Sequence, residues 1–251
     1  MANHPRFLPL LPFPPWLPWL AFGPLVLALL LAALASGATA AETVPDTLGQ
    51  RALACTGCHG PQGRSTPLGY VPRIAGKPAG YLAAQLRAFR DGQRQHDGMA
   101  RLLAHLGDDY LAELAGHFAA LQVPYAAPAP AGGTPASRTL GRQLVQQGDA
   151  ARRLPACTAC HGTAMTGVEP AVPGLLGLPR DYLVAQLGAW RTGSRIARQP
   201  DCMAVLAQRL QPQDITAVAD WLAAQPLPAA TSAAPARPPS TWPLPCGSTA
   251  P

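Results

Sequence analysis

The sequence predicts an all-α protein of two small domains in tandem, related by an internal repeat. A block around Cys55 returns around Cys157 at an offset of 102 residues, and later blocks return at offsets of 101 and 104. Within the later blocks the apolar residues recur every three to four positions, which is the period of a helix. The offset changes between blocks, and because loops absorb insertions more easily than helices do, the blocks mark the structural elements.

The chain begins with a predicted export segment, residues 1–40. Arg6 precedes an apolar run over residues 25–35, and Ala38-Thr39-Ala40 offers a small-residue cleavage site. This pattern is typical of a signal peptide. Because residues 5–24 extend the hydrophobic run, an uncleaved N-terminal anchor is the alternative. Either form places the remaining chain in the periplasm, with membrane contact only through this segment.

Proline marks the predicted ends of the domains. Of 30 prolines, seven lie in residues 1–40, four in 122–137 and eight in 226–251. We predict a Pro/Ala-rich linker over 122–137 and a disordered tail over 226–251, because neither stretch has enough apolar surface to offset its ordering entropy. The domains are then residues 42–121 and 138–225, each small enough to need a stabilising cross-link or cofactor.

Two helices are predicted in each half. Their apolar faces are Tyr81, Leu82, Leu86 and Phe89 with Leu111, Leu114, Ala115 and Phe118 in the first half, and Tyr182, Leu183, Leu187 and Trp190 with Ile215, Val218, Ala219 and Leu222 in the second. Asp108 is the predicted N-cap of one helix, and Pro212 suits the first turn of its counterpart. The aromatic residues in these faces are predicted to serve packing and not electron conduction.

A Cys-x-x-Cys-His motif occurs at the same place in both repeats. Its members are Cys55, Cys58, His59, Cys157, Cys160 and His161. The spacing is that of c-type haem attachment, in which both thiols form thioethers to the porphyrin and the histidine reaches the iron. A zinc knuckle needs four ligands at each site, and a thioredoxin-type pair needs neither the histidine nor a matched downstream methionine. The prediction is two haem c groups.

The sixth iron ligands are predicted to be Met99 and Met203. They lie 40 and 42 residues after His59 and His161, and they match across the repeat. Thioether ligation favours ferrous iron and raises the reduction potential. His96 is the alternative in the first half, although it has no counterpart near Met203.

Four further repeated residues are predicted to support the haems. Pro72 and Pro173 follow the histidines by 13 and 12 residues, and their carbonyls would accept a hydrogen bond from the histidine Nδ1–H. Arg94 and Arg195 would pair with haem propionates, or alternatively would be solvated surface residues.

Two cysteines, Cys202 and Cys246, are left outside the motifs. A disulfide between them would hold the tail beside the second haem, and the alternatives are free thiols or a cross-link to a partner.

These motifs resemble those of the dihaem class I cytochromes c of the cytochrome c4 type. The resemblance covers about residues 44–225 and includes Pro72-x-Ile74-x-Gly76, Pro173-x-Leu175-x-Gly177 and both Tyr-Leu-x-x-Gln-Leu helices. It implies two cytochrome c folds, with haems facing each other across a pseudo-twofold interface. It further implies a periplasmic electron carrier of the respiratory chain, commonly acting towards a terminal oxidase.

The predicted function is therefore electron transfer between redox proteins and not catalysis. The expected partners are a terminal oxidase, a quinol-oxidising complex or a dehydrogenase. A cytochrome subunit of a flavocytochrome sulfide dehydrogenase or quinoprotein dehydrogenase is the alternative, and a peroxidase would need an open haem that His/Met ligation does not leave. The formal charge of +6 predicts no nucleic-acid binding, because four haem propionates offset most of it.

Overall fold

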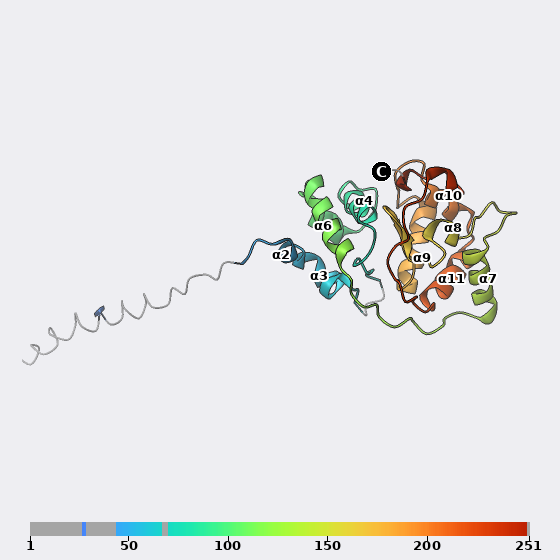
Figure 1. Ribbon diagram of the computed structural model, residues 1–251, viewed down its shortest axis with the longest axis horizontal. Helices are drawn as coiled ribbons and strands as arrows, with labels where there is room; N and C mark the ends of the chain where they lie inside the picture. Colours follow the sequence, from blue (N-terminus) through green and yellow to red (C-terminus); the bar gives the residue numbers. More distant parts are fainter. Residues whose placement is uncertain (1–26, 29–43, 67–69, 250–251) are drawn as a thin grey trace, which may run out of the picture. The chain divides into compact units, whose positions relative to one another are not determined.

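The first half of the protein is a small helical domain. The computed structural model describes residues 27–28, 44–66 and 70–249, so the predicted export segment lies almost wholly outside the described residues. The elements of this half are α2 (Leu48–Arg51), α3 (Leu53–His59), the 3₁₀ turn η1 (Pro61–Gly63), α4 (Ala79–Arg90), α5 (Asp97–Leu103) and α6 (Asp108–Ala120) (Figure 1).

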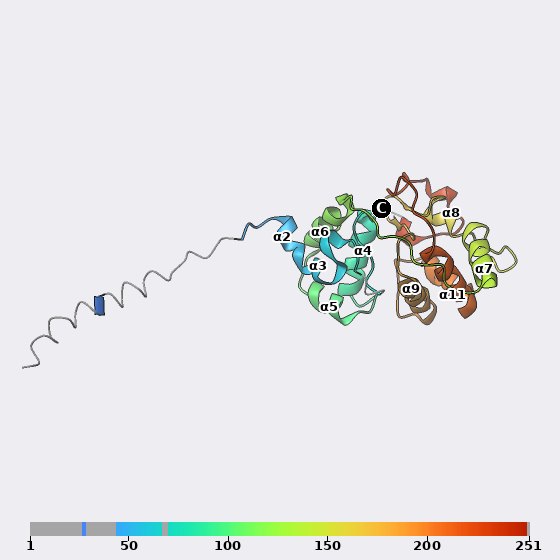
Figure 2. The same ribbon diagram turned by 90° about the horizontal axis from the view of Figure 1, so that it is seen from below.

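The core of the first half forms between α4 and α6. Leu82 and Phe89 of α4 are buried, and Leu111, Leu114, Ala115 and Phe118 of α6 are all buried as their spacing predicts. The prediction that Asp108 is an N-cap is wrong by one position, because Gly107 is the cap and Asp108 lies in the first turn. In the first turn its carboxylate still interacts favourably with the positive end of the helix dipole. Helix α5 packs beside α4 (Figure 2).

The second half repeats this arrangement with additions. Its elements are α7 (Pro135–Gln146), α8 (Thr158–His161), β1 (Gly167–Val168), β2 (Val172–Pro173), α9 (Arg180–Thr192), α10 (Cys202–Arg209), α11 (Pro212–Ala223), η2 (Pro239–Thr241) and η3 (Gly247–Thr249). Helix α11 packs against α7 and α9, and Pro212 is in its first turn as predicted. Asp214 completes a capping box with Gln211 and also pairs with Arg152 at 2.6 Å. These two interactions fix the first turn of α11.

Two short strands, β1 and β2, were not expected from the sequence. They form an antiparallel ladder in which Gly167 faces Pro173 and Val168 faces Val172. Strands of two residues are too short to show an alternating pattern, and Pro is rarely found inside a strand. Apart from this ladder and three isolated bridges, the described residues are helices, turns and irregular chain, in agreement with the predicted all-α class.

The segments outside the two predicted domains agree only in part with the expectation of unstructured chain, since residues 122–134 form no helix or strand. Helix α7 already begins at Pro135, inside the segment expected to be a linker. Residues 226–249 pack against the second half, where Ala234 forms a parallel bridge with Val168 and Cys246 forms a disulfide with Cys202. The composition predicts too little apolar burial for order, but a cross-link and backbone hydrogen bonds replace that burial here. No helix among the described residues is long and apolar enough to cross a membrane.

Candidate haem sites

Short helices present the two Cys-x-x-Cys-His motifs. In the first half Cys55, Cys58 and His59 lie on α3, and in the second half Cys160 and His161 lie on α8. Helical spacing of three residues places both thiols of a motif on the same side of the helix. Gly60 and Gly162 end these helices at φ values of 75° and 84°, which favour glycine. At Gly60 a side chain would also overlap the Ser65 carbonyl, so the chain turns sharply directly after the histidine.

The histidine rings are fixed by the proline carbonyls. Nδ1 of His59 lies 2.8 Å from the Pro72 carbonyl oxygen, and Nδ1 of His161 lies 2.7 Å from that of Pro173. This is the contact that the sequence analysis predicts. Burial lowers the pKa of both histidines, which favours neutral imidazole. A ring whose Nδ1–H donates to a carbonyl keeps the Nε2 lone pair available for a metal.

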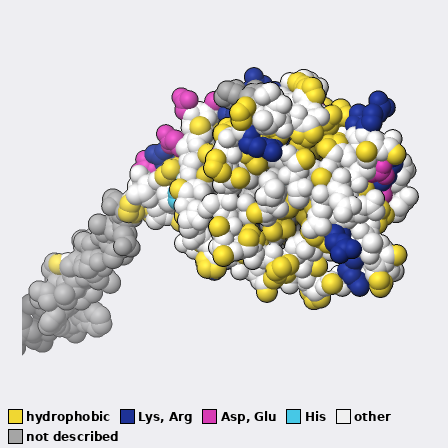
Figure 3. Space-filling view, turned by 45° about the vertical axis from the view of Figure 1, so that its right-hand side comes forward, with side chains coloured by type: hydrophobic (Ala, Val, Ile, Leu, Met, Phe, Trp, Pro, Cys, Tyr) yellow, Lys and Arg dark blue, Asp and Glu magenta, His cyan; other side chains and the backbone are white. Residues whose placement is uncertain are grey.

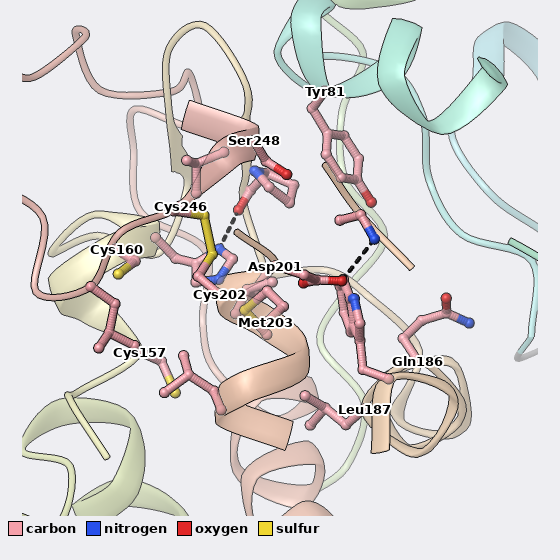
Figure 4. A pocket seen from close by; sticks show the side chains of 18 of the residues that line it. Tyr81, Cys157, Cys160, Gln186, Leu187, Asp201, Cys202, Met203, Cys246 and Ser248 are labelled. Atoms are coloured by element: carbon pink, nitrogen blue, oxygen red, sulfur yellow. Dashed lines mark hydrogen bonds between the residues drawn. A yellow bond between two sulfur atoms is a disulfide. The ribbon is translucent and has the colours of Figure 1, made fainter. Parts of the chain in front are cut away.

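In the second half one cavity brings the predicted haem residues together. Cys157, Cys160, His161 and Met203 all line it, and most other lining side chains are aliphatic. Figure 4 shows Cys157, Cys160 and Met203 in this cavity. Burial raises the pKa of the Cys157 thiol to about 12, so this thiol is neutral before attachment. The apolar wall, the paired thiols, the oriented imidazole and the thioether form a donor set that fits haem.

In the first half Met99 lies on α5. It packs against the cluster of Phe89, Leu103 and Leu111. His96, the alternative ligand, is the N-cap of α5, and its Nδ1 accepts a hydrogen bond from the Met99 N–H at 3.3 Å. His96 therefore has a structural role in starting the helix that carries Met99.

Arg94 and Arg195 lie between the two halves. They are 7% and 4% exposed, so the reading of solvated surface arginines is wrong. Arg94 donates to Gln85 at 2.8 Å and to Gln186 at 2.7 Å, and Arg195 donates to the same two residues at 2.7 and 2.9 Å. Arg94 also donates to the Tyr182 hydroxyl at 2.8 Å. The two halves are thus joined by a reciprocal Arg–Gln network.

The glutamines of this network were missed as functional residues. Gln85 and Gln186 lie in the repeated Tyr-Leu-x-x-Gln-Leu helices, in which the apolar residues alone predict the packed face. The sequence does contain a signal for this role, because Gln85 and Gln186 repeat at the same offset along the chain as Arg94 and Arg195. A residue that pairs across a pseudo-twofold axis must be kept in both halves.

Lys77 makes a second contact between the halves that the sequence did not predict. Its Nζ donates to the Gly174 carbonyl at 2.7 Å, and the side chain is buried. Burial, with a smaller contribution from the nearby Arg73, lowers its pKa to about 7. Gly174 directly follows Pro173, so this lysine contacts the loop that orients His161.

The chain is similar to several known proteins. No protein-family model matches it. The thiosulfate dehydrogenase electron acceptor of Thiomonas intermedia is 39% identical over 72% of this chain and 83% of its own. Cytochrome c4 of Pseudomonas aeruginosa is 32% identical over 68% of this chain and 84% of its own.

The chain belongs to the cytochrome c4 family. Cytochrome c4 structures consist of two tandem cytochrome c domains, and the repeat and helical fold found here agree with this. As a cytochrome c4-type protein, the chain carries two haem c groups and acts in electron transfer.

One solved structure adds a further likeness. The thiosulfate dehydrogenase TsdBA of Marichromatium purpuratum matches 69% of this chain with a TM-score of 0.61 and 37% identity. The matched region is only 36% of that longer chain. The relatives do not favour the alternative of a flavocytochrome or quinoprotein dehydrogenase subunit.

Proposed function

We propose that this cytochrome c4-type protein accepts electrons from a thiosulfate-oxidising dehydrogenase in the periplasm and passes them to a respiratory partner. The observation that carries the proposal is the 39% identity to a thiosulfate dehydrogenase electron acceptor over 83% of that protein's length. The likeness to part of TsdBA supports the same kind of donor. The predicted signal peptide and the disulfide support the periplasmic location.

The haem attachment follows the two motifs. Cys55 and Cys58 would hold one haem, and Cys157 and Cys160 the other. Haem, once bound, supplies reversible one-electron chemistry. The protein residues enclose it and set its potential.

The axial ligands would be His59 with Met99 and His161 with Met203. The support in the second half is that His161 and Met203 line the same cavity as the two cysteines. Two protein ligands on each iron leave no position for a substrate. This favours an electron carrier over a peroxidase.

Arg94 and Arg195 would supply positive charge to the haem propionates. Among the described residues no ion pair joins either arginine to a carboxylate, although both are buried. Buried charges are normally paired. Propionates at the junction of the halves would provide that pairing in addition to the glutamine contacts.

Reduction by a donor enzyme tests the function. The oxidised holoprotein is mixed with thiosulfate and a catalytic amount of thiosulfate dehydrogenase, and the ferrous haem absorbance is followed. We expect both haems to be reduced with multiple turnovers, and no reduction when the enzyme is omitted. If a flavocytochrome sulfide dehydrogenase with sulfide reduces the protein and the thiosulfate enzyme does not, the proposed donor is wrong.

A further inference from the structure

The C-terminal segment, residues 226–249 and here named the strap, is bound to the second half at several separate places. Ala234 N donates to the Gly167 carbonyl at 2.9 Å, and its own carbonyl accepts from Glu169 N at 2.8 Å. Farther along, Gly247 N donates to the Pro200 carbonyl at 2.9 Å. The disulfide between Cys246 and Cys202 lies next to this contact.

One strap residue lies directly on the haem-attachment motif. Arg237 Nη2 donates to the Ala159 carbonyl at 2.7 Å and lies 3.5 Å from that of Cys160. Its guanidinium stacks over the Trp242 ring at 4.1 Å. The middle of the strap is therefore fixed to the chain between the two haem-binding cysteines.

The strap also forms part of the wall of the second haem cavity. Trp242, Leu244 and Cys246 line the cavity together with Cys160 and Met203, and Figure 4 shows the disulfide beside Met203. Gly247 lies so close to the carbonyls of Arg198 and Gln199 that a side chain there would overlap them. This end of the strap is in tight contact with the segment leading into α10.

The Cys-x-x-Cys-His motif of the first half is more exposed than that of the second half. Cys58 is exposed and His59 half-buried, whereas Cys160 is half-buried and His161 is buried. The chain that follows the first half, residues 122–134, makes its contacts elsewhere. Arg73 binds the carbonyls of Val123 and Pro124, and Ala129 N donates to the Ala223 carbonyl.

We propose that the strap, held by the Cys202–Cys246 disulfide, closes the second haem pocket, so that external ligands and reductants reach the first haem in preference to the second. The inference rests on the proposed His/Met ligation but not on the proposed donor. Met203 directly follows Cys202, and Asp201 caps the same helix by accepting from Ala204 N at 3.0 Å. Exchange of Met203 for an external ligand needs space beside α10, and the cross-linked strap occupies that space.

Imidazole binding to the ferric holoprotein tests this proposal. The protein is labelled with ¹³C-methyl methionine, and loss of the iron-shifted Met99 and Met203 signals is followed as imidazole is added. We expect Met99 to be displaced at concentrations at least about tenfold below those that displace Met203. In the double variant Cys202→Ser/Cys246→Ser, Met203 should be displaced at imidazole concentrations at least about tenfold lower than in the parent, with Met99 unchanged.

Two further variants keep the test decisive. Ser240→Ala changes an exposed strap residue and should behave as the parent protein. Trp242→Ala retains the disulfide but removes part of the cavity wall, and should lower the imidazole concentration that displaces Met203 even if the cysteine variant does not fold. Displacement of both methionines at the same concentration in the parent protein, or an unchanged Met203 concentration in both variants, overturns the proposal. Because no thiosulfate dehydrogenase is used, the result is independent of the donor experiment.

Discussion

The two halves build the same loop after the haem-binding histidine from different side chains. Gly63 and Met165 occupy equivalent positions, since their carbonyls accept from Ile74 N and Leu175 N at 2.9 Å in both cases. Both have positive φ, 70° and 56°. A Cβ on Gly63 would lie 2.6 Å from Ile74 Cγ1 and 3.0 Å from the Phe118 ring.

In the second half a smaller helix residue leaves room for a larger loop residue. Leu222 stands where the first half has Phe118, and Met165 is 3% exposed in the core. Compared with the first half, the second half therefore has less apolar side-chain volume on its last helix and more in the loop. At this loop the repeat therefore preserves the backbone path and hydrogen bonds, while each half fills its interior with different side chains.

On the face shown in Figure 3, Lys and Arg side chains lie in separate small groups and not in one patch. From the differences in packing and in coverage by the strap, we expect the two haems to be inequivalent.

Replacement of the proposed axial methionines, Met99 and Met203, should have the largest effect. In Met99→His and Met203→His, loss of the thioether should lower the midpoint potential of one haem by tenths of a volt, within the ~0.8 V span that axial ligands control. Potentiometric titration should show one component shifted and the other within about 0.05 V of its original value. Met165→Leu is the control. A shift of both components in Met99→His would contradict independent ligation.

Exchange of side chains between the halves tests the packing comparison. Gly63→Met should destabilise the holoprotein by about 2–4 kcal/mol, because it adds a side chain at positive φ in a filled space. Adding Phe118→Leu should recover about 1–2 kcal/mol by providing the volume found in the second half. Urea unfolding measures both values. If the second change only adds to the loss, the proposed compensation is wrong.

The interface network should respond to removal of either arginine. Arg94→Met and Arg195→Met should each cost about 2–3 kcal/mol of unfolding free energy, because glutamine and tyrosine groups are left without partners in a buried place. The double variant should lose less than the sum, by about 1–2 kcal/mol, since both arginines share Gln85 and Gln186. Arg87→Met on α4 serves as the control outside the network. Strict additivity would argue against a shared network.

Lys77 should give the smallest effect, one visible only as a dependence on pH. Its pKa falls from 10.5 to about 7 on folding because the side chain is buried. Between these pH values the unfolded chain binds more protons, so the unfolding free energy should rise with pH, by about 1 kcal/mol between pH 7 and pH 8. Lys77→Met should remove this slope. Parallel pH profiles for the two proteins would show that Lys77 is charged in the folded state.

The sequence predicts the features that repeat and are local. The haem motifs, the apolar faces of α4, α6, α9 and α11 and the proline contacts to the histidines follow from spacing and duplication. Contacts such as Lys77 with Gly174 and Arg237 with Ala159 join segments 97 and 78 residues apart, and no local pattern specifies them. The order of the strap could not be predicted either, because it depends on the pairing of two cysteines whose partners the spacing leaves open.

Each half of the chain is expected to bind one haem covalently. Intact mass spectrometry of the protein produced with a cytochrome c maturation system tests it most directly, with the Cys55→Ala/Cys58→Ala and Cys157→Ala/Cys160→Ala variants measured beside it. The parent protein should have the mass of the polypeptide plus two haems, and each variant the mass of the polypeptide plus one haem. A parent protein that carries only one haem or none, after maturation that loads a control cytochrome, would contradict it.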